Sequence, residues 1–146
     1  GLTGGTVPHV DLEQAPKVFA AVHNAIISGL VKSCHDLSEG GLATAAAEMA
    51  FAGGLGVDLD LTVMSNSSAI SDAAVLLFSE STTRFLIETT PESASKLEEV
   101  FQGLPINEIG ATTSSARVRA SWYGQLVLDA DCSELKAAWL KPLAWE

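Results

Sequence analysis

Residues 30–61 constrain the fold most, because their hydrophobic pattern changes from strand-like to helical and back. Residues 30–34, LVKSC, are a short apolar run that predicts a strand. The alanine-rich run 41–52 predicts a helix, which a cluster of glycines ends. Residues 57–61, VDLDL, alternate apolar and acidic side chains, as a half-solvated strand does. The segment that joins the first strand to the helix, HDLSEGG, is crowded with polar groups.

The other segments add helices and strands, with both hairpin and helix-crossover connections between them. A tight hairpin turn is predicted at Tyr123-Gly124, and residues 62–73 read as a polar connection with a short helical turn. Further helices are predicted over 11–28, 90–102 and 133–140, and further strands over 74–78, 84–89, 106–112, 116–122 and 125–128. This order predicts an α/β (α+β) fold in which a mixed, partly antiparallel sheet of about six strands is layered with helices. The many hairpins exclude a doubly wound sheet.

The length of 146 residues suits a single domain over residues 1–146. Because residue 1 is Gly rather than Met, we expect a chain that is processed, trimmed or cut from a longer one. No apolar run approaches the roughly 20 residues of a membrane helix, and no signal peptide is evident. Two cysteines give no disulfide framework, so a reducing, cytoplasmic location is expected.

The charge balance excludes one class of partner. Eight Lys and Arg against eighteen Asp and Glu give a formal charge of −10. An extended nucleic-acid surface needs a basic stripe, which this chain lacks, so we expect no nucleic-acid partner. A bound phosphate would have to be held by backbone N–H groups, by a metal ion or by a neighbouring domain.

The segment HDLSEGGL at residues 35–42 has the composition of an anion and metal site. It stands at a strand-to-helix junction, where helix N-termini offer unsatisfied N–H groups. Gly40 and Gly41 leave room for a phosphate to approach, and Asp36 can reach a magnesium ion. Ser38 is placed to cap the helix, and His35 can donate a hydrogen bond or simply pack. Capping alone explains several of these residues, so the structural interpretation stays open beside the chemical one.

Three motifs in a fixed order carry a resemblance to a known family. They are HDxSxGGL, AEMAFAG and FSESxxRFL, accompanied by the lead-in GGTVPHVDLEQ and a late IGA. Together they resemble the C-terminal domain of the phosphoribosylformylglycinamidine synthase family, within the aminoimidazole ribonucleotide synthetase superfamily. The resemblance covers nearly the whole chain and matches the second of that family's two tandem copies.

The resemblance implies a role in an ATP-dependent ligase of purine biosynthesis. Such an enzyme converts formylglycinamide ribonucleotide, ATP and glutamine-derived ammonia to formylglycinamidine ribonucleotide. By resemblance, Asp36 is a Mg²⁺ ligand at a bound ATP or ADP, and Ser38 touches that nucleotide. Gly40 and Gly41 are expected to be nucleotide-binding because they leave room for its phosphates. Glu39 stands where the family often has Asp, a mild departure from the motif. The parent can be a long single chain or a shorter subunit of an amidotransferase complex.

Further implied residues come from the third motif. Glu80 and Ser81 match an acid–hydroxyl pair that touches substrate in the family's first copy, and Arg84 can pair with Glu80 instead. Together with His35 they are candidates for a substrate or interface role. No catalytic residue is expected in this chain, so the domain alone should be inactive. The expected partners are the other domains of the same synthase, a glutaminase domain or subunit, and the nucleotide.

Two alternatives remain. The chain can be the C-terminal domain of another superfamily member, of the aminoimidazole ribonucleotide synthetase, selenophosphate synthetase or thiamine-phosphate kinase type. It can also be a non-catalytic scaffold module that keeps the fold without the site. The combination of HDxSxGGL with FSESxxRFL argues against the first alternative, and intact Asp36 and Ser38 argue against the second.

Overall fold

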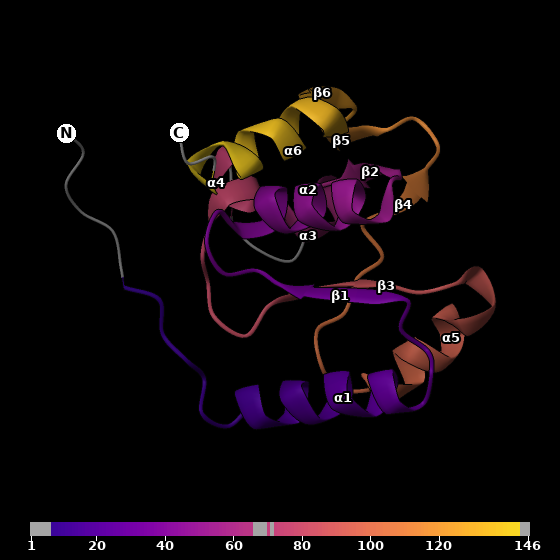
Figure 1. The fold of residues 1–146 in the computed structure, drawn as a ribbon. Coiled ribbons are helices and arrows are strands. Elements are labelled where there is room, and N and C mark those ends of the chain that lie inside the picture. Colours follow the sequence, from indigo (N-terminus) through magenta and orange to yellow (C-terminus); the bar gives the residue numbers. More distant parts are fainter. Residues whose placement is uncertain (1–6, 66–69, 71, 144–146) are drawn as a thin grey trace. The chain divides into compact units, whose positions relative to one another are not determined.

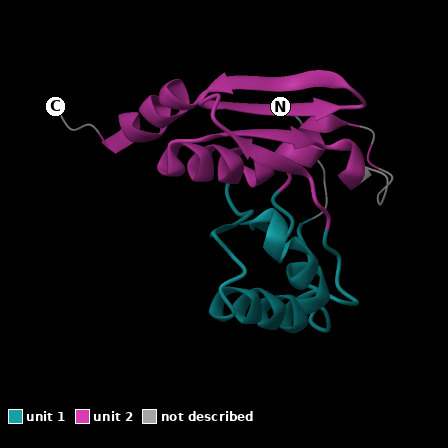
Figure 2. Ribbon diagram, turned by 90° about the vertical axis from the view of Figure 1, so that its right-hand side faces the viewer, with its two compact units in different colours: residues 1–39, 80–106 teal, residues 40–79, 107–146 magenta. Residues whose placement is uncertain are grey.

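The computed structural model describes residues 7–65, 70 and 72–143 (Figure 1). The chain divides into two compact units, each built from two separate stretches of sequence (Figure 2). Unit 1 comprises residues 1–39 and 80–106, and unit 2 comprises residues 40–79 and 107–146. That residues 1–146 act as a single domain stays a prediction.

Unit 1 is a two-stranded antiparallel sheet with two helices. Its elements are α1 (Ala15–Ile27), β1 (Ser33–Asp36), β3 (Phe85–Glu88) and α5 (Pro91–Val100). The strands pair from Ser33 opposite Glu88 to Asp36 opposite Phe85. A proline near the start of each helix suits this position, because its missing N–H would have no helical partner there.

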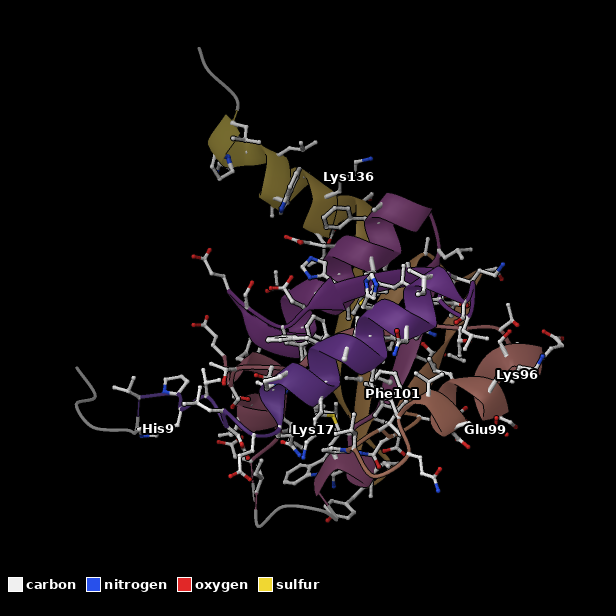
Figure 3. All side chains as sticks on the ribbon, turned by 90° about the horizontal axis from the view of Figure 1, so that it is seen from below. His9, Lys17, Lys96, Glu99, Phe101 and Lys136 are labelled. Atoms are coloured by element: carbon white, nitrogen blue, oxygen red, sulfur yellow. The ribbon has the colours of Figure 1, made fainter. Side chains whose placement is uncertain are left out.

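The core of unit 1 lies between the apolar face of α1 and the C-terminal end of α5. The side chains of Val18, Val22 and Ala25 are buried at spacings of three and four residues. They pack with Leu97 and Phe101. In Figure 3, Phe101 lies beside α1, whereas the exposed Lys96 and Glu99 side chains of α5 point away from it. An amphipathic helix packed in this way stabilises a sheet that would be marginal alone.

Unit 2 is a four-stranded mixed sheet with helices. Its sheet has the order β4-β2-β5-β6, in which β2 and β5 are parallel and the other pairs are antiparallel. The elements are α2 (Gly41–Gly53), β2 (Gly56–Asp60), α3 (Thr62–Ser65), α4 (Ala73–Phe78), β4 (Gly110–Thr113), β5 (Arg117–Trp122), β6 (Gln125–Asp131), α6 (Cys132–Leu140) and the 3-10 helix η1 (Lys141–Leu143).

The two faces of the unit 2 sheet differ in polarity along β5. Val118 and Ala120 are fully buried, and α2 packs against this strand through its small alanine side chains. The intervening Arg117 and Arg119 both reach Asp129 on β6, with Nε to Oδ1 distances of 2.5 and 3.4 Å. This alternation is the period of two expected for a sheet covered on one face.

The predicted mixed α/β class is confirmed, with helices and six strands among the described residues. The strands occupy two sheets rather than the one sheet expected. Most predicted elements appear within a few residues of their expected bounds.

One predicted strand is wrong. Residues 74–78 belong to the helix α4, whose N-cap Asp72 accepts a hydrogen bond from the Ala74 N–H at 2.9 Å. Leu76 and Leu77 are buried side by side there. An apolar run this short fits a buried strand and a buried helical turn equally well, so the capping hydrogen bond favours the helix.

In the part of the chain that the structure describes, no helix has both the length and the apolar character needed to cross a membrane.

Candidate functional site

The β1–β3 pair positions the first half of the HDLSEGGL segment in unit 1. His35 and Asp36 are the last two residues of β1, opposite Leu86 and Phe85 of β3. Just beyond the strand, the Leu37 N–H donates to the Arg84 carbonyl oxygen at 2.9 Å, and the Leu37 side chain is buried. These contacts fix the point at which the chain leaves the sheet.

The Asp36 carboxylate is open to solvent at the end of β1. Its side chain is 62% exposed, and the His35 Nδ1 lies 3.5 Å from its Oδ1 atom. The same His35 nitrogen lies 2.6 Å from the Asp36 carbonyl oxygen, so a proton on Nδ1 is donated to the backbone. His35 therefore has a local structural partner, and the carboxylate stays accessible to a cation.

The third-motif residues precede β3 in unit 1. Glu80 and Ser81 are exposed, and Arg84 is half-buried. Burial lowers the pKa of the Arg84 guanidinium below its ordinary value. Thr82 in the same turn donates from its hydroxyl to the His9 carbonyl oxygen at 2.9 Å, which ties the turn to the segment before α1. The Glu80–Arg84 ion pair stays a prediction.

Gly40 is the N-cap of α2 in unit 2 and Gly41 is its first residue, and both have left-handed backbones, with φ of +77° and +61°. A Cβ on Gly41 would lie 2.7 Å from the Ser79 carbonyl oxygen and 2.9 Å from that of Leu77, at the end of α4. A Cβ on Gly40 would collide with the Thr44 side chain. Backbone geometry and close packing therefore require glycine here, whether or not a phosphate binds.

The prediction that Ser38 caps α2 is wrong. The N-cap of this helix is Gly40, and no side chain caps it. A capping side chain must come from the residue directly before the helix, and Ser38 lies two positions too early. Glu39, the residue before Gly40, does not occupy the N-cap either. The exposed Ser38 hydroxyl is thus not committed to the helix.

The candidate residues are divided between the units. Unit 1 holds His35, Asp36, Ser38, Glu80, Ser81 and Arg84, and unit 2 holds Gly40 and Gly41. Among the described residues, no three His, Cys, Asp or Glu side chains gather to hold a metal ion. A lone exposed carboxylate fits Mg²⁺ in one way, because this ion often takes one or two protein carboxylates and completes its shell with phosphate oxygens and water.

Both thiols are shielded rather than activated. Burial raises the pKa of Cys34, and the negative charge of Asp36 adds to this effect. Burial likewise raises the pKa of Cys132, and the neighbouring Asp131 adds to it. A reactive cysteine needs a lowered pKa, so neither thiol has the surroundings of a nucleophile.

Unit 2 contains a cavity of about 290 Å³ that was not predicted from the sequence. Its walls come from α2, α4, α6 and the inner face of β5 and β6. The α2 wall has a readable signal, since Thr44, Ala47, Glu48 and Phe51 share one helical face. The α6 wall, with Trp139, lies some ninety positions further along the chain and could not be paired with α2 from spacing alone.

Comparison with known proteins decides the family. The family model for the AIR synthase related protein, C-terminal domain, matches residues 1–123. The chain belongs to this family. The family resemblance that the ordered motifs indicated is therefore confirmed.

Curated relatives of this AIR synthase-related domain are much longer proteins. The phosphoribosylformylglycinamidine synthase subunit PurL of Deinococcus radiodurans is 40% identical over 146 residues, which cover 98% of this chain and 19% of that protein. The same subunit of Thermococcus gammatolerans is 38% identical over 137 residues, covering 94% and 18%. The chain spans about a fifth of the length of these relatives.

Solved structures share the fold. PurL of Thermotoga maritima complexed with FGAR matches with a TM-score of 0.80 at 22% identity, over 88% of this chain and 22% of that one. The same protein complexed with ATP matches with a TM-score of 0.73 at 23% identity, over 82% and 21%. At such identities the likeness establishes the architecture of the domain.

Proposed function

We propose that this AIR synthase-related domain is part of an ATP-dependent ligase of purine biosynthesis. The enzyme would convert formylglycinamide ribonucleotide, ATP and glutamine-derived ammonia to formylglycinamidine ribonucleotide. The observation that carries the proposal is the 40% identity to a phosphoribosylformylglycinamidine synthase subunit across 98% of the chain. The domain would be the second-copy C-terminal domain of a longer, cytoplasmic protein.

Within that protein, we assign Asp36 as a ligand of the magnesium ion that accompanies ATP or ADP. Its exposed carboxylate at the end of β1 supports this role. Ser38 would donate a hydrogen bond from its hydroxyl to the nucleotide. This hydroxyl is exposed and does not cap α2, which supports the role. When bound, magnesium supplies charge compensation for the phosphates.

Gly40 and Gly41 would contribute backbone N–H groups at the start of α2. The first N–H groups of a helix have no helical acceptor, and the aligned peptide dipoles favour an anion there. The packing of Gly41 against the carbonyls of Leu77 and Ser79 holds this end of the helix in place. Gly41 can therefore both pack against the end of α4 and present its backbone N–H to a phosphate.

His35, Glu80, Ser81 and Arg84 would act at a substrate or at an interface with other domains of the synthase. The exposure of Glu80 and Ser81 supports contact with something outside unit 1. The ammonia would come from a glutaminase domain or subunit, because neither thiol of this chain has a lowered pKa. No catalytic residue is assigned to this chain.

An assay of the longer protein tests the proposal. With ammonium as nitrogen donor, it should form formylglycinamidine ribonucleotide only when ATP is present, and residues 1–146 alone should not. The longer protein could instead fail to turn over formylglycinamide ribonucleotide and turn over the substrate of another superfamily member. That result would assign the chain to that other enzyme. Turnover by residues 1–146 alone would also contradict the proposal.

A further inference from the structure

The cavity of unit 2 has walls that are apolar except at two positions. It is lined by alanine, valine and leucine side chains from α2, β5, β6 and α6, and by three aromatic rings. The two polar side chains in its lining are Thr44 and Glu48, and Glu48 is its one ionisable group. A volume of about 290 Å³ is at the lower end for ligand sites and suits a small molecule or a single side chain.

The Glu48 carboxylate is held in place beside two aromatic rings. The Trp139 indole N–H donates to its Oε1 atom at 2.9 Å, which connects α6 to α2 across the cavity. The Trp139 ring is tilted by 52° against Phe51, with ring centroids 5.9 Å apart. Trp139 and the third aromatic residue, Phe78, are about half exposed, at 50% and 53%. Aromatic rings therefore lie at the opening of the cavity, and its ionisable group is the Glu48 carboxylate.

From this arrangement we infer that the cavity binds an alkylammonium group. An aliphatic stem would pack against the apolar walls, and the ammonium would lie against the Glu48 carboxylate. The Glu48 carboxylate would give the ammonium a charge-assisted hydrogen bond, and the aromatic rings of the same lining would cover its aliphatic stem. The chain's formal charge of −10 also favours the approach of a cation.

Other ligand classes fit the cavity less well. An anion would meet the Glu48 charge with no basic side chain in the lining to offset it. A neutral apolar ligand would displace water from the carboxylate without returning a hydrogen bond, which is unfavourable. A carboxylate offers about four acceptor sites, so Glu48 can receive an ammonium donor beside the partners it already has, the Trp139 indole among them. The nearby Lys136 of α6 is exposed and projects outward (Figure 3), and it is not part of the lining.

The test is a titration monitored by NMR through the Trp139 indole N–H signal. This signal is assigned by its loss in Trp139→Phe. Addition of n-butylammonium should shift this signal saturably, whereas n-butanol, which has the same stem without the charge, should bind at least about tenfold more weakly. Equal binding of the two compounds, or no saturable shift with n-butylammonium, would overturn the inference. Both titrations use the unsubstituted protein, and Trp139→Phe serves only to assign the signal.

Two variants locate the charge that matters. Glu48→Gln keeps an acceptor for the indole but removes the charge, and should weaken n-butylammonium binding by about tenfold or more. Glu108→Gln removes an exposed carboxylate of unit 2 outside the cavity and should leave binding unchanged. Unaltered binding in Glu48→Gln would contradict the assignment of the site.

A second amine separates the two sources of an alkylammonium group. Nα-acetyl-lysine methylamide presents the same group as a side chain on a peptide backbone. Tighter binding of this compound than of n-butylammonium would assign the site to a lysine of another protein segment, and the reverse order would assign it to a free amine. The inference does not depend on the proposed ligase activity, so either can fail without the other.

Discussion

Gly41 must be glycine for structural reasons, apart from its proposed role in nucleotide binding. A Cβ at this position would meet two backbone carbonyl oxygens within 3 Å, and the φ of +61° is already unfavourable for other residues. Gly41→Ala should lower the free energy of unfolding by about 2–4 kcal/mol, from backbone strain and the enforced shift of α4. Chemical denaturation in urea measures the loss.

Gly54→Ala is the matched control for Gly41→Ala. Gly54 has a similar φ of +69°, but a Cβ there would meet no atom within 4 Å. Its substitution should cost only the backbone term, about 1–2 kcal/mol. Equal losses in the two variants would show that the contact of Gly41 with α4 has no energetic weight.

Asp129 should give unit 2 a pH-dependent contribution to stability. The hydrogen bond donated by Arg117 holds the pKa of Asp129 below its ordinary value. A lowered folded-state pKa means that this stabilisation is complete above the unfolded-state pKa of about 3.9, and is lost as the pH falls through the folded-state pKa. Asp129→Asn should therefore lower Tm at neutral pH, with a difference from the parent that shrinks below about pH 4.

Thermal unfolding of both proteins between neutral and strongly acidic pH measures this difference. A difference in Tm that stays constant through the acid range would show that the ionised Asp129 carboxylate is not what Arg117 stabilises.

Among the elements, α6 owes its start to a side-chain cap. The Asp131 Oδ1 atom accepts hydrogen bonds from the Ser133 N–H at 2.8 Å and the Glu134 N–H at 3.3 Å. Asp131→Ala should cost about 1 kcal/mol of unfolding free energy, because two helical N–H groups lose their acceptor. Asp131→Asn keeps an acceptor and should cost clearly less. Equal losses would assign the effect to the lost charge opposite Arg117 rather than to the cap.

The sequence predicted an element correctly where the residues of that element mark its own start or end. The helix α2 was predicted from its alanines and the glycines at its end, and α5 from Thr90-Pro91. The segment at 74–78 was misassigned because a short apolar run does not reveal its period. The cap of α2 was misplaced because the helix begins at Gly41 with Gly40 as its N-cap, two residues beyond the serine that the residue types favoured as a cap. The Glu48–Trp139 hydrogen bond was beyond prediction, because the two residues meet only in the fold.

At the scale of the whole molecule, each unit should depend on its own core. Phe101 is 5% exposed within the α1 and α5 cluster, so Phe101→Ala should cost about 3–5 kcal/mol of unfolding free energy. Phe19→Ala is the matched control, because Phe19 is about half exposed and touches Phe85 edge-on, and it should cost about 1 kcal/mol.

Hydrogen exchange in the Phe101→Ala variant shows where stability is lost. The backbone amides of β1 and β3 should lose protection first, because α1 and α5 supply the core on which this two-stranded sheet depends. Loss of protection confined to β5 and β6 would contradict a separate core in unit 1.

Three ordered motifs were enough to predict the family of the chain, but they did not predict the geometry of the proposed nucleotide site. The chain spans about a fifth of its curated relatives, so the partners of Asp36 and Ser38 in a complete nucleotide site would come largely from the rest of the longer protein. Site residues could be proposed one by one from the motifs. Their shared geometry could not, because no spacing rule reaches residues outside the chain.

The measurement that tests the account most directly is magnesium-dependent nucleotide affinity in the longer protein. Asp36→Asn keeps the side-chain shape and removes the charge, and should weaken ATP binding on the order of tenfold with magnesium present and little without it. Asp58→Asn, which removes an exposed carboxylate of β2 in unit 2, should leave the affinity unchanged. An Asp36→Asn protein that binds ATP as tightly as the parent in magnesium would contradict the assignment of Asp36 as the metal ligand.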